Sequence, residues 1–233
     1  MTTTIYTDGS SRGNPGPGGW GAIICADNEI KELGGREDHT TNNRMELSAV
    51  INALVYVDES DIEGEIVIQT DSKYVIQGIT SWVLGWQKNG WKTAGKKDVI
   101  NRDLWEALSF ASSGLSISWK YVEGHAGHPG NERCDEIATS FADKASVMLY
   151  HGALSKYPVD LNAEYKPSIK KSLKKSSSAK AYSYLSLVGG VLKKHTSWAE
   201  CEARVKGVRG AKFKKAFSAT DEATIAREWG VNL

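Results

Sequence analysis

Residues 65–72, EIVIQTDS, constrain the fold of this chain more than any other segment. The run is apolar and rich in β-branched residues, which is typical of a strand in the centre of a sheet. Apolar residues recur at helical spacing on both sides of it, over 42–57 and from 73 onward. A central strand between two helices predicts an α/β protein whose helices pack on a sheet.

The rest of the first 145 residues supplies the other elements of this sheet. Alternating residues predict strands on either side of a glycine- and proline-rich loop over 12–19, paired as an antiparallel meander. We expect strands over 3–10, 20–27, 29–38, 65–72 and 115–124, and helices over 42–57, 81–91, 98–111 and 131–145 and from 73. Asn42 or Asn43 is expected to cap the helix over 42–57, and Asp98 the helix that begins there.

Charge is divided unevenly along the chain, although the formal net charge is only +1. Residues 1–165 hold 14 basic and 23 acidic side chains, whereas residues 166–215 hold 14 basic and 2 acidic ones. The basic segment indicates a polyanionic partner, most simply nucleic acid, or else a solvated lysine-rich linker. Composition predicts a large domain over 1–150, a flexible Lys/Ser-rich linker over 151–180 and a small α/β domain over 181–233.

Composition also disfavours several classes of protein. No run of about 18 apolar residues occurs, so no transmembrane helix is expected. The first residues, MTTTIYTDGS, lack the basic and apolar regions of a secretory signal. The three cysteines form no CxxC pair, which disfavours a disulfide framework or a zinc site and fits a reducing compartment. We therefore expect a cytoplasmic protein with no membrane partner.

Four acidic residues on four predicted elements are expected to converge. Asp8 and Asp71 end strands that can be parallel neighbours, so both would lie at one edge of the sheet. Glu46 lies in the first turn of the helix between them in sequence, and Asp135 near the start of the last helix. Crowded carboxylates repel one another, and oxygen-ligated cations such as Mg²⁺ or Mn²⁺ relieve that repulsion. Two such ions would suit phosphodiester cleavage; alternatively, each acid is a cap or a surface charge.

Four segments occur in the order YTDGSSRGNPGPGGWGAII, TTNNRMEL, TDSKYVIQGI and GHAGHPGNERCDEIA. Together they resemble type 1 ribonuclease H, the enzyme that cuts RNA within RNA–DNA hybrids, over about residues 3–145. The resemblance implies the ribonuclease H-like α/β fold, a five-stranded mixed sheet with helices on both faces. It implies an endonuclease that uses two metal ions and leaves 3′-hydroxyl and 5′-phosphate ends. Its metal-binding acids fall on Asp8, Glu46, Asp71 and Asp135.

His125 lies in the glycine-rich segment GHAGHPGNE, where it matches the histidine of the family's motif. Imidazole titrates near neutral pH, so His125 can shuttle a proton from the leaving oxygen or help the product to depart. A lone histidine is more often structural, and that is how we interpret His128.

Recognition of a hybrid calls for polar groups close to the metals, because the two strands differ in their 2′-hydroxyls. The residues expected to contact the substrate here are Gly9, Ser10, Asn14, Thr41, Asn42 and Asn43. By resemblance the three asparagines would contact the minor groove, and the threonine would help to hold a phosphate of the DNA strand. Alternatively, Asn42 and Asn43 only cap a helix.

Residues 82–97, WVLGWQKNGWKTAGKK, interleave three tryptophans with four lysines. The stretch resembles the basic protrusion of longer ribonucleases H, which grips the DNA strand through aromatic and basic side chains. The residues concerned are Trp82, Trp86, Lys88, Trp91, Lys92, Lys96 and Lys97. Alternatively the tryptophans pack in the core, and we expect at least one to do so. Lys73 departs from the glutamine that relatives commonly carry beside the catalytic aspartate.

The segment TSWAECEARVKGVRGAKFKKAFSATDEA resembles the hybrid-binding domain, also called the viroplasmin-like domain, which usually stands at the amino end of ribonucleases H. By resemblance Trp198 and Phe213 would stack on deoxyriboses, and Lys214 and Lys215 would meet phosphates or backbone. The preceding residues, YSYLSLVGGVLKKH, depart from the usual first hairpin of that domain. Alternatively, this is a basic module with a tryptophan in its core.

The leading hypothesis is therefore a metal-dependent, monomeric endoribonuclease that acts on RNA–DNA hybrids, associated with the nucleoid if the source is bacterial. An alternative is a non-catalytic protein that binds RNA–DNA hybrids or double-stranded RNA, and the four acids argue against it. A polynucleotidyl transferase of the same fold is a third hypothesis, disfavoured by the short chain and the lack of a recognisable DNA-recognition or multimerisation domain.

Overall fold

The computed structural model describes residues 2–161, 163, 181–208 and 210–231. The chain divides into two compact units, residues 1–168 and residues 169–233. No helix in the described residues is long and apolar enough to cross a membrane. Most of the predicted linker, residues 162 and 164–180, lies outside the described residues.

The first unit is built on a six-stranded mixed sheet in the order β5-β4-β1-β2-β3-β6. β1 pairs in parallel with β4, and β4 with β5, whereas β2, β3 and β6 continue the sheet in antiparallel fashion. The five predicted strands are all present, and β6 adds a short sixth. The strands are β1 (Thr2–Ser11), β2 (Gly16–Ala26), β3 (Glu29–Thr40), β4 (Glu65–Thr70), β5 (Ser116–Tyr121) and β6 (His151–Ala153).

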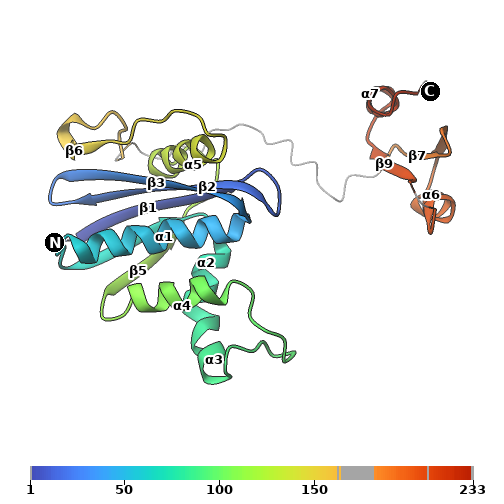
Figure 1. The fold of residues 1–233 in the computed structure, drawn as a ribbon. Coiled ribbons are helices and arrows are strands. Elements are labelled where there is room, and N and C mark those ends of the chain that lie inside the picture. The colour runs from blue at the N-terminus through green and yellow to red at the C-terminus, as the bar shows by residue number, and fades with distance from the viewer. Residues whose placement is uncertain (1, 162, 164–180, 209, 232–233) are drawn as a thin grey trace. The chain divides into compact units, whose positions relative to one another are not determined.

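Helices cover both faces of this sheet (Figure 1). On one face, α1 and α4 bury an apolar core that includes Ile5, Leu47 and Trp105. On the other face, α5 packs with residues after it over Ile23 and Ile30. The helices are α1 (Asn42–Glu59), α2 (Lys73–Gln77), the π-helix η1 (Gly78–Trp82), α3 (Val83–Lys88), α4 (Arg102–Ala111), α5 (Pro129–Ala142) and the 3₁₀-helix η2 (Leu154–Lys156).

The glycine- and proline-rich segment is more regular than the sequence suggests. β1 continues to Ser11 and β2 begins at Gly16, so strand residues replace much of the predicted loop over 12–19. The reason is the close approach of α5 to the sheet. A Cβ atom on Gly19 would lie 2.3 Å from the carbonyl oxygen of Ala138. Glycine serves here to bring a helix against a strand, not to break the strand.

Two predicted helix caps are wrong. Thr41, not Asn42 or Asn43, is the N-cap residue of α1, and its side chain makes no capping hydrogen bond. α4 begins at Arg102, with Asn101 as its N-cap residue in the left-handed conformation at φ 59°. Asparagine tolerates that conformation better than most residues. Asp98 instead accepts a hydrogen bond from Lys92.

The predicted linker begins later than residue 151. β6 pairs with β3 at the edge of the sheet, and Leu154 donates a backbone hydrogen bond to the carbonyl of Asn28. Tyr157 is 9% exposed and packs against Ile30 and Cys134. Residues 151–157 are therefore part of the first unit, because tertiary contacts order a segment whose composition alone indicates a linker.

The second unit is a three-stranded antiparallel sheet in the order β8-β7-β9, with two helices. Its core contains Leu185, Ala216 and Ile225. Ser197 and Ser218 cap the two helices by accepting backbone hydrogen bonds from residues three positions on. The elements are β7 (Ser183–Val188), β8 (Val191–His195), α6 (Trp198–Val205), β9 (Lys212–Ala216) and α7 (Ala219–Glu228).

Candidate active site

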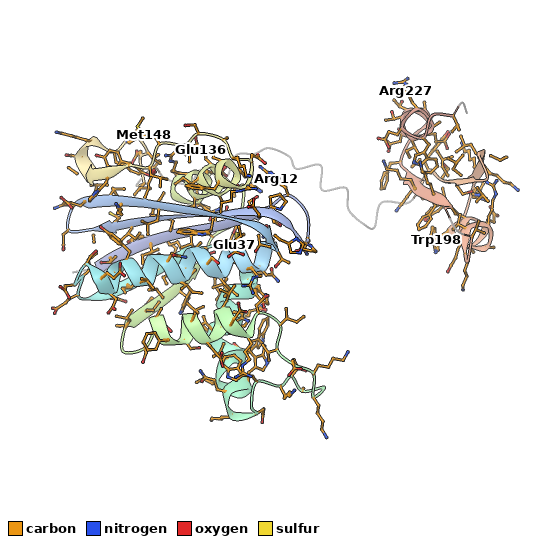
Figure 2. All side chains as sticks on the ribbon, viewed as in Figure 1. Arg12, Glu37, Glu136, Met148, Trp198 and Arg227 are labelled. Carbon is orange, nitrogen blue, oxygen red and sulfur yellow. The ribbon has the colours of Figure 1, made fainter. Side chains whose placement is uncertain are left out.

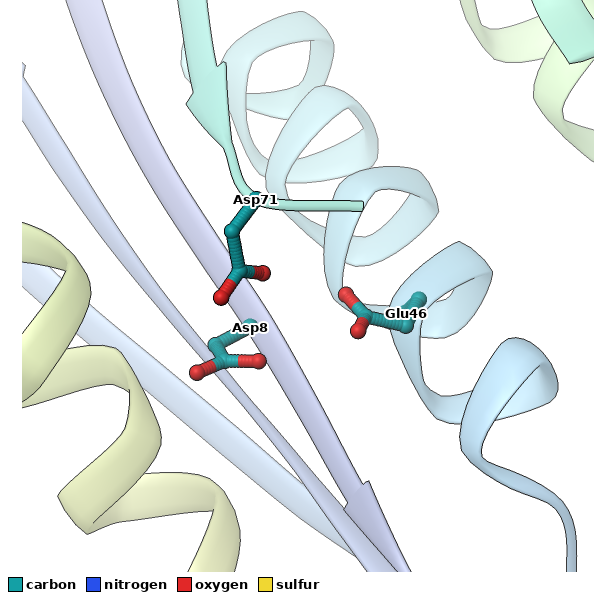
Figure 3. Close-up of side chains that lie close together, drawn as sticks. All are labelled: Asp8, Glu46 and Asp71. Carbon is teal, nitrogen blue, oxygen red and sulfur yellow. The ribbon is translucent and has the colours of Figure 1, made fainter. Parts of the chain in front are cut away.

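Three carboxylates from three elements meet at one edge of the first sheet (Figure 3). Asp8 lies in β1, Glu46 in α1, and Asp71 directly after β4. Their nearest oxygens all lie within 4.8 Å of one another. The parallel pairing of β1 with β4 brings the two aspartates together, as the sequence predicts. Asp8 and Glu46 are each 6% exposed, so the cluster is largely shielded from water.

Each of these acids has a hydrogen-bond donor beside it. The backbone N–H of Gly9 donates to Asp8 Oδ1 at 2.7 Å, and Asn42 Nδ2 donates to Glu46 Oε1 at 3.2 Å. Asn131 Nδ2 lies 3.4 Å from Asp71 Oδ2. Asn131 was missed by the sequence analysis.

The position of Asn131 carried a signal that could have revealed it. It lies in the segment GHAGHPGNE and one helical turn before Asp135, so the two residues share a face of α5. A residue on that face would be expected to approach the acids.

The cluster is electrostatically strained without a cation. Burial, followed by the charges of Asp71 and Asp135, raises the pKa of Asp8 to about 8. Burial and the charges of Asp8 and Asp71 raise the pKa of Glu46 well above its ordinary value. Glu46 Oε2 is buried and has no hydrogen-bond partner among the described residues. An unpartnered carboxylate oxygen beside two more carboxylates fits a divalent cation with oxygen ligands.

Asp135 and His125 lie further out than the three clustered acids. Asp135, in α5, is not part of the 4.8 Å group, although its charge acts on Asp8. Burial raises the pKa of Asp135, and nearby His125 acts in the opposite direction. His125 is exposed in the loop between β5 and α5 and has a φ of 51°. The predicted residues are thus near one another, but only three acids form the cluster.

The residues predicted to contact the substrate differ in their exposure to solvent. Gly9 is buried inside β1, and Ser10 is half-buried beside it. Asn14 is exposed in the turn between β1 and β2, and Asn42 and Asn43 are exposed at the start of α1. Gly9 lies in the predicted strand and packs closely against the start of α1.

Gly9→Ala is expected to lower both the melting temperature and the rate of the enzyme. A Cβ atom at position 9 would lie 2.3 Å from the backbone nitrogen of Glu46, so α1 would have to move. Overpacking of this kind costs about 1–3 kcal/mol. Thermal unfolding and single-turnover cleavage would measure it. Gly85→Ala, where the added methyl would meet nothing within 4 Å, is the matched control; equal behaviour of the two variants would contradict the prediction.

The tryptophans of residues 82–97 differ in burial: Trp91 is buried, and Trp82 and Trp86 are half-buried. Trp91 is 9% exposed, which confirms that at least one of them packs in the core. The rings of Trp82 and Trp86 lie 5.6 Å apart, and Trp86 lies 5.8 Å from Trp105. The four lysines of the segment, in contrast, are exposed: Lys88, Lys92, Lys96 and Lys97.

Exposed aromatic rings gather on the second unit. Trp198 and Phe213 are 39% and 54% exposed, and their ring centroids lie 5.3 Å apart. Tyr184 lies 5.8 Å from Trp198, so three rings form one cluster, with Trp198 on α6 (Figure 2). Lys214 pairs with Glu228 at 2.8 Å, and Lys215 lies over the ring of Phe217. We refer to Tyr184, Trp198 and Phe213 as the aromatic cluster.

A mixed α/β sheet with a buried acidic cluster at its edge defines a class of nucleases that use bound metal ions. Residues 1–143 match the sequence model of the family described as RNase H. Because this match spans more than half of the chain, the chain belongs to the RNase H family, and it is an enzyme. Residues 195–226 match a second family model, described as the Ribonuclease H1 N-terminal domain.

Curated relatives are similar to the first unit. A protein named Ribonuclease H from Bradyrhizobium sp. is 55% identical over 135 residues, which are 58% of this chain and 86% of that protein. Another, from Alcanivorax borkumensis, is 54% identical over 140 residues, 60% of this chain and 91% of that protein. The crystal structure of LC9-RNase H1, described as a type 1 RNase H, matches with 31% identity and a TM-score of 0.57. That match covers 66% of this chain and 79% of the other, and confirms the predicted ribonuclease H-like fold.

Proposed function

We propose that this enzyme is an endonuclease that hydrolyses the RNA strand of RNA–DNA hybrids and leaves 3′-hydroxyl and 5′-phosphate ends. The observation that carries the proposal is the buried cluster of Asp8, Glu46 and Asp71, in which Glu46 Oε2 lacks a partner. Membership of the RNase H family and its relatives named Ribonuclease H support the same activity.

The metal ligands of the proposed enzyme are Asp8, Glu46 and Asp71, with Asp135 as an outer ligand. Two Mg²⁺ ions, or Mn²⁺, would neutralise these acids and stabilise the attacking and leaving oxygens of the phosphodiester. Hydrogen bonds from Gly9, Asn42 and Asn131 hold the carboxylates in place. These contacts keep the ligand oxygens aimed at one point before a cation arrives.

His125→Ala is expected to lower kcat by roughly 100-fold with a smaller effect on KM. A positioned proton shuttle contributes on the order of 10²-fold or more. His125 is exposed close to Asp135, where it can reach a leaving group and then move away. Steady-state kinetics on a hybrid would measure the change, with the exposed His151→Ala as control. An unaltered kcat would leave His125 a loop residue only.

The substrate would lie across the exposed groups around the cluster. Polar contacts near the metals are assigned to Gly9, Ser10, Asn14, Thr41, Asn42 and Asn43. The lysines of residues 82–97 would meet phosphates of the DNA strand, since they are exposed. Trp82 and Trp86 are only partly buried and remain available to a deoxyribose, whereas buried Trp91 would act by holding the segment in shape.

The second unit is proposed to bind the same hybrid. Two rings of its aromatic cluster, Trp198 and Phe213, are exposed, and aromatic rings stack on sugars and bases without regard to sequence. Lys215 shares a face of β9 with Phe213, whereas Lys214 lies on the other face beside Glu228. Both would supply phosphate contacts, Lys214 after it exchanges Glu228 for a phosphate. The match of residues 195–226 to the Ribonuclease H1 N-terminal domain supports this assignment.

Incubation of the full chain with labelled duplexes tests the proposal. An RNA–DNA hybrid should be cut in its RNA strand only when Mg²⁺ or Mn²⁺ is present, and the fragments should carry 5′-phosphates. Double-stranded RNA and DNA duplexes of the same sequence serve as controls. Binding without cleavage under all conditions would favour the non-catalytic alternative, and joining of DNA ends would favour the transferase.

A further inference from the structure

A second buried acid lies away from the acidic cluster and is not used by the proposed chemistry. Glu32, in β3, has a fully buried side chain and accepts four hydrogen bonds. Arg133 donates from Nε and Nη2 at 2.8 Å each, Tyr157 from its hydroxyl at 2.5 Å, and the backbone N–H of Tyr150 at 2.9 Å. Burial opposes ionisation of this acid, but these donors outweigh it and hold the pKa of Glu32 below its ordinary value.

One of these donors, Tyr157, belongs to the segment that composition assigned to a linker, and Tyr150 directly precedes that segment. We call residues 148–157 the strap. The strap is held on β3 by the pairing of β6 with β3 and by two hydrogen bonds between Glu32 and Tyr150. The Glu32 N–H donates to the Tyr150 carbonyl, and the Tyr150 N–H donates to the Glu32 carboxylate. The rings of Tyr150 and Tyr157 lie 5.0 Å apart over the apolar side of the sheet that α5 covers.

Arg133 joins the strap to α5. It also donates to the carbonyl of Met148 and pairs with Glu136, both at 2.8 Å, and these residues lie on the α5 side of the sheet (Figure 2). Successive residues of an α-helix are rotated by about 100°, so Asn131 and Asp135 share a face and Arg133 points the other way. The same two turns of α5 therefore contact Asp71 on one side, through Asn131, and Glu32 on the other.

We propose that Glu32, Arg133 and Tyr157 are positioning residues of the nuclease, through which the strap fixes α5 and so sets the place of Asp135 and Asn131 relative to Asp8 and Asp71. None of the three touches the acidic cluster itself, so their effect reaches the reaction through the helix. The inference rests on the proposed function, since it concerns the turnover of that same site. Its physical basis is that misplacement by about 1 Å can cost on the order of 100-fold in rate.

The experiment compares single variants of the full chain by steady-state cleavage of a hybrid with Mg²⁺. Tyr157→Phe removes one hydroxyl and keeps the ring, and Glu32→Gln removes the charge that Arg133 pairs with. Each is expected to lower kcat by about tenfold while KM stays within about twofold, because substrate contacts are untouched. The double variant should lose less than the product of the two single losses, since both act through one network.

Two controls separate positioning from simple loss of stability. Tyr150→Phe removes a hydroxyl from the same strap that, among the described residues, donates to the Ala153 carbonyl and not to Glu32, so its kcat should not change. Leu108→Ala leaves a cavity in the core beneath α4, on the face of the sheet opposite to α5. It should lower the melting temperature but not kcat, provided that kcat is measured at a temperature where the protein stays folded. If Glu32→Gln does not fold, the kcat of Tyr157→Phe alone tests the positioning role.

The outcomes distinguish this inference from the proposed function. If the wild-type chain does not cut the hybrid, the proposed function falls. If the wild type cuts and Tyr157→Phe matches Tyr150→Phe in kcat, only the positioning role is overturned. The positioning role would also be overturned if Leu108→Ala lowered kcat as much as Tyr157→Phe or Glu32→Gln does, at the same loss of melting temperature.

Discussion

Asp8→Asn should abolish hydrolysis of an RNA–DNA hybrid while leaving its binding within about a few-fold of wild type. The substitution keeps the size of the side chain but removes one of three crowded charges. Divalent cations then bind more weakly and are misplaced, whereas contacts to phosphates and sugars elsewhere remain. Cleavage rate and hybrid affinity, measured separately on the same preparation, check both halves of the prediction.

The same variant should be more stable than wild type in the absence of metal. Folding of wild type must either take up a proton on Asp8, whose pKa is raised to about 8, or bury its charge beside Glu46 and Asp71, and asparagine avoids both costs. Added Mg²⁺ should raise the melting temperature of wild type more than that of the variant, since binding to the folded state stabilises it. Asp58→Asn, at an exposed position of the same unit, is the control. Near-normal turnover by Asp8→Asn would contradict the proposal that Asp8 is a metal ligand.

The sequence predicts the acidic cluster because the cluster follows from local patterns. Asp8 and Asp71 each follow a run of strand residues. Two hairpins make β3 parallel to β1, and the crossover from β3 through α1 makes β4 parallel to both, so β1 and β4 can pair in parallel. Glu46 lies one turn beyond the start of α1, and its side chain reaches the same edge. Asn131 could have been found in the same way, because the predicted helix over 131–145 places it one turn before Asp135 and on the same face.

The strap and the helix caps could not be predicted, because their stability is tertiary. Residues 151–157 have little apolar content of their own, and Tyr157 is ordered by Glu32, a partner 125 positions away in sequence. Asp98 has the residue type of a cap but pairs with Lys92 instead. Gly19 indicates a turn in isolation, yet it lies in a strand because α5 requires the space. For Tyr157 and Gly19 a contact distant in sequence overrides a local preference, whereas Asp98 is held by a lysine six positions away.

Removal of the second unit should leave an active nuclease that binds its hybrid more weakly. The cut belongs after Ala163, because a chain that ended before Tyr157 would lose the hydrogen bond of that residue to Glu32. Both units belong to one chain, so a hybrid held by one meets the other at an effective concentration near the millimolar range. The truncated enzyme should therefore show a higher Kd, and fewer cleavages per encounter, with kcat close to that of the full chain.

Point variants test whether the aromatic cluster accounts for the loss of hybrid affinity on truncation. Trp198→Ala and Phe213→Ala should each cost about 1–3 kcal/mol of hybrid affinity, which is about fivefold to a hundredfold in Kd. Phe110→Ala is the matched control, since it removes a ring that is 86% exposed on α4 of the first unit. The measurement uses catalytically inactive Asp8→Asn protein, so that the hybrid survives the titration.

Salt dependence separates stacking from charge. Each phosphate contact that is lost reduces the slope of log Kd against log salt by about one. The double variant Lys214→Ala plus Lys215→Ala should therefore flatten the slope, whereas Trp198→Ala should shift the whole curve with little change in slope. Truncation after Ala163 should do both. If the full and truncated chains gave superimposable curves, the second unit would not bind the hybrid, and the assignment of the acidic cluster would be unaffected, because every acid in it lies in the first unit.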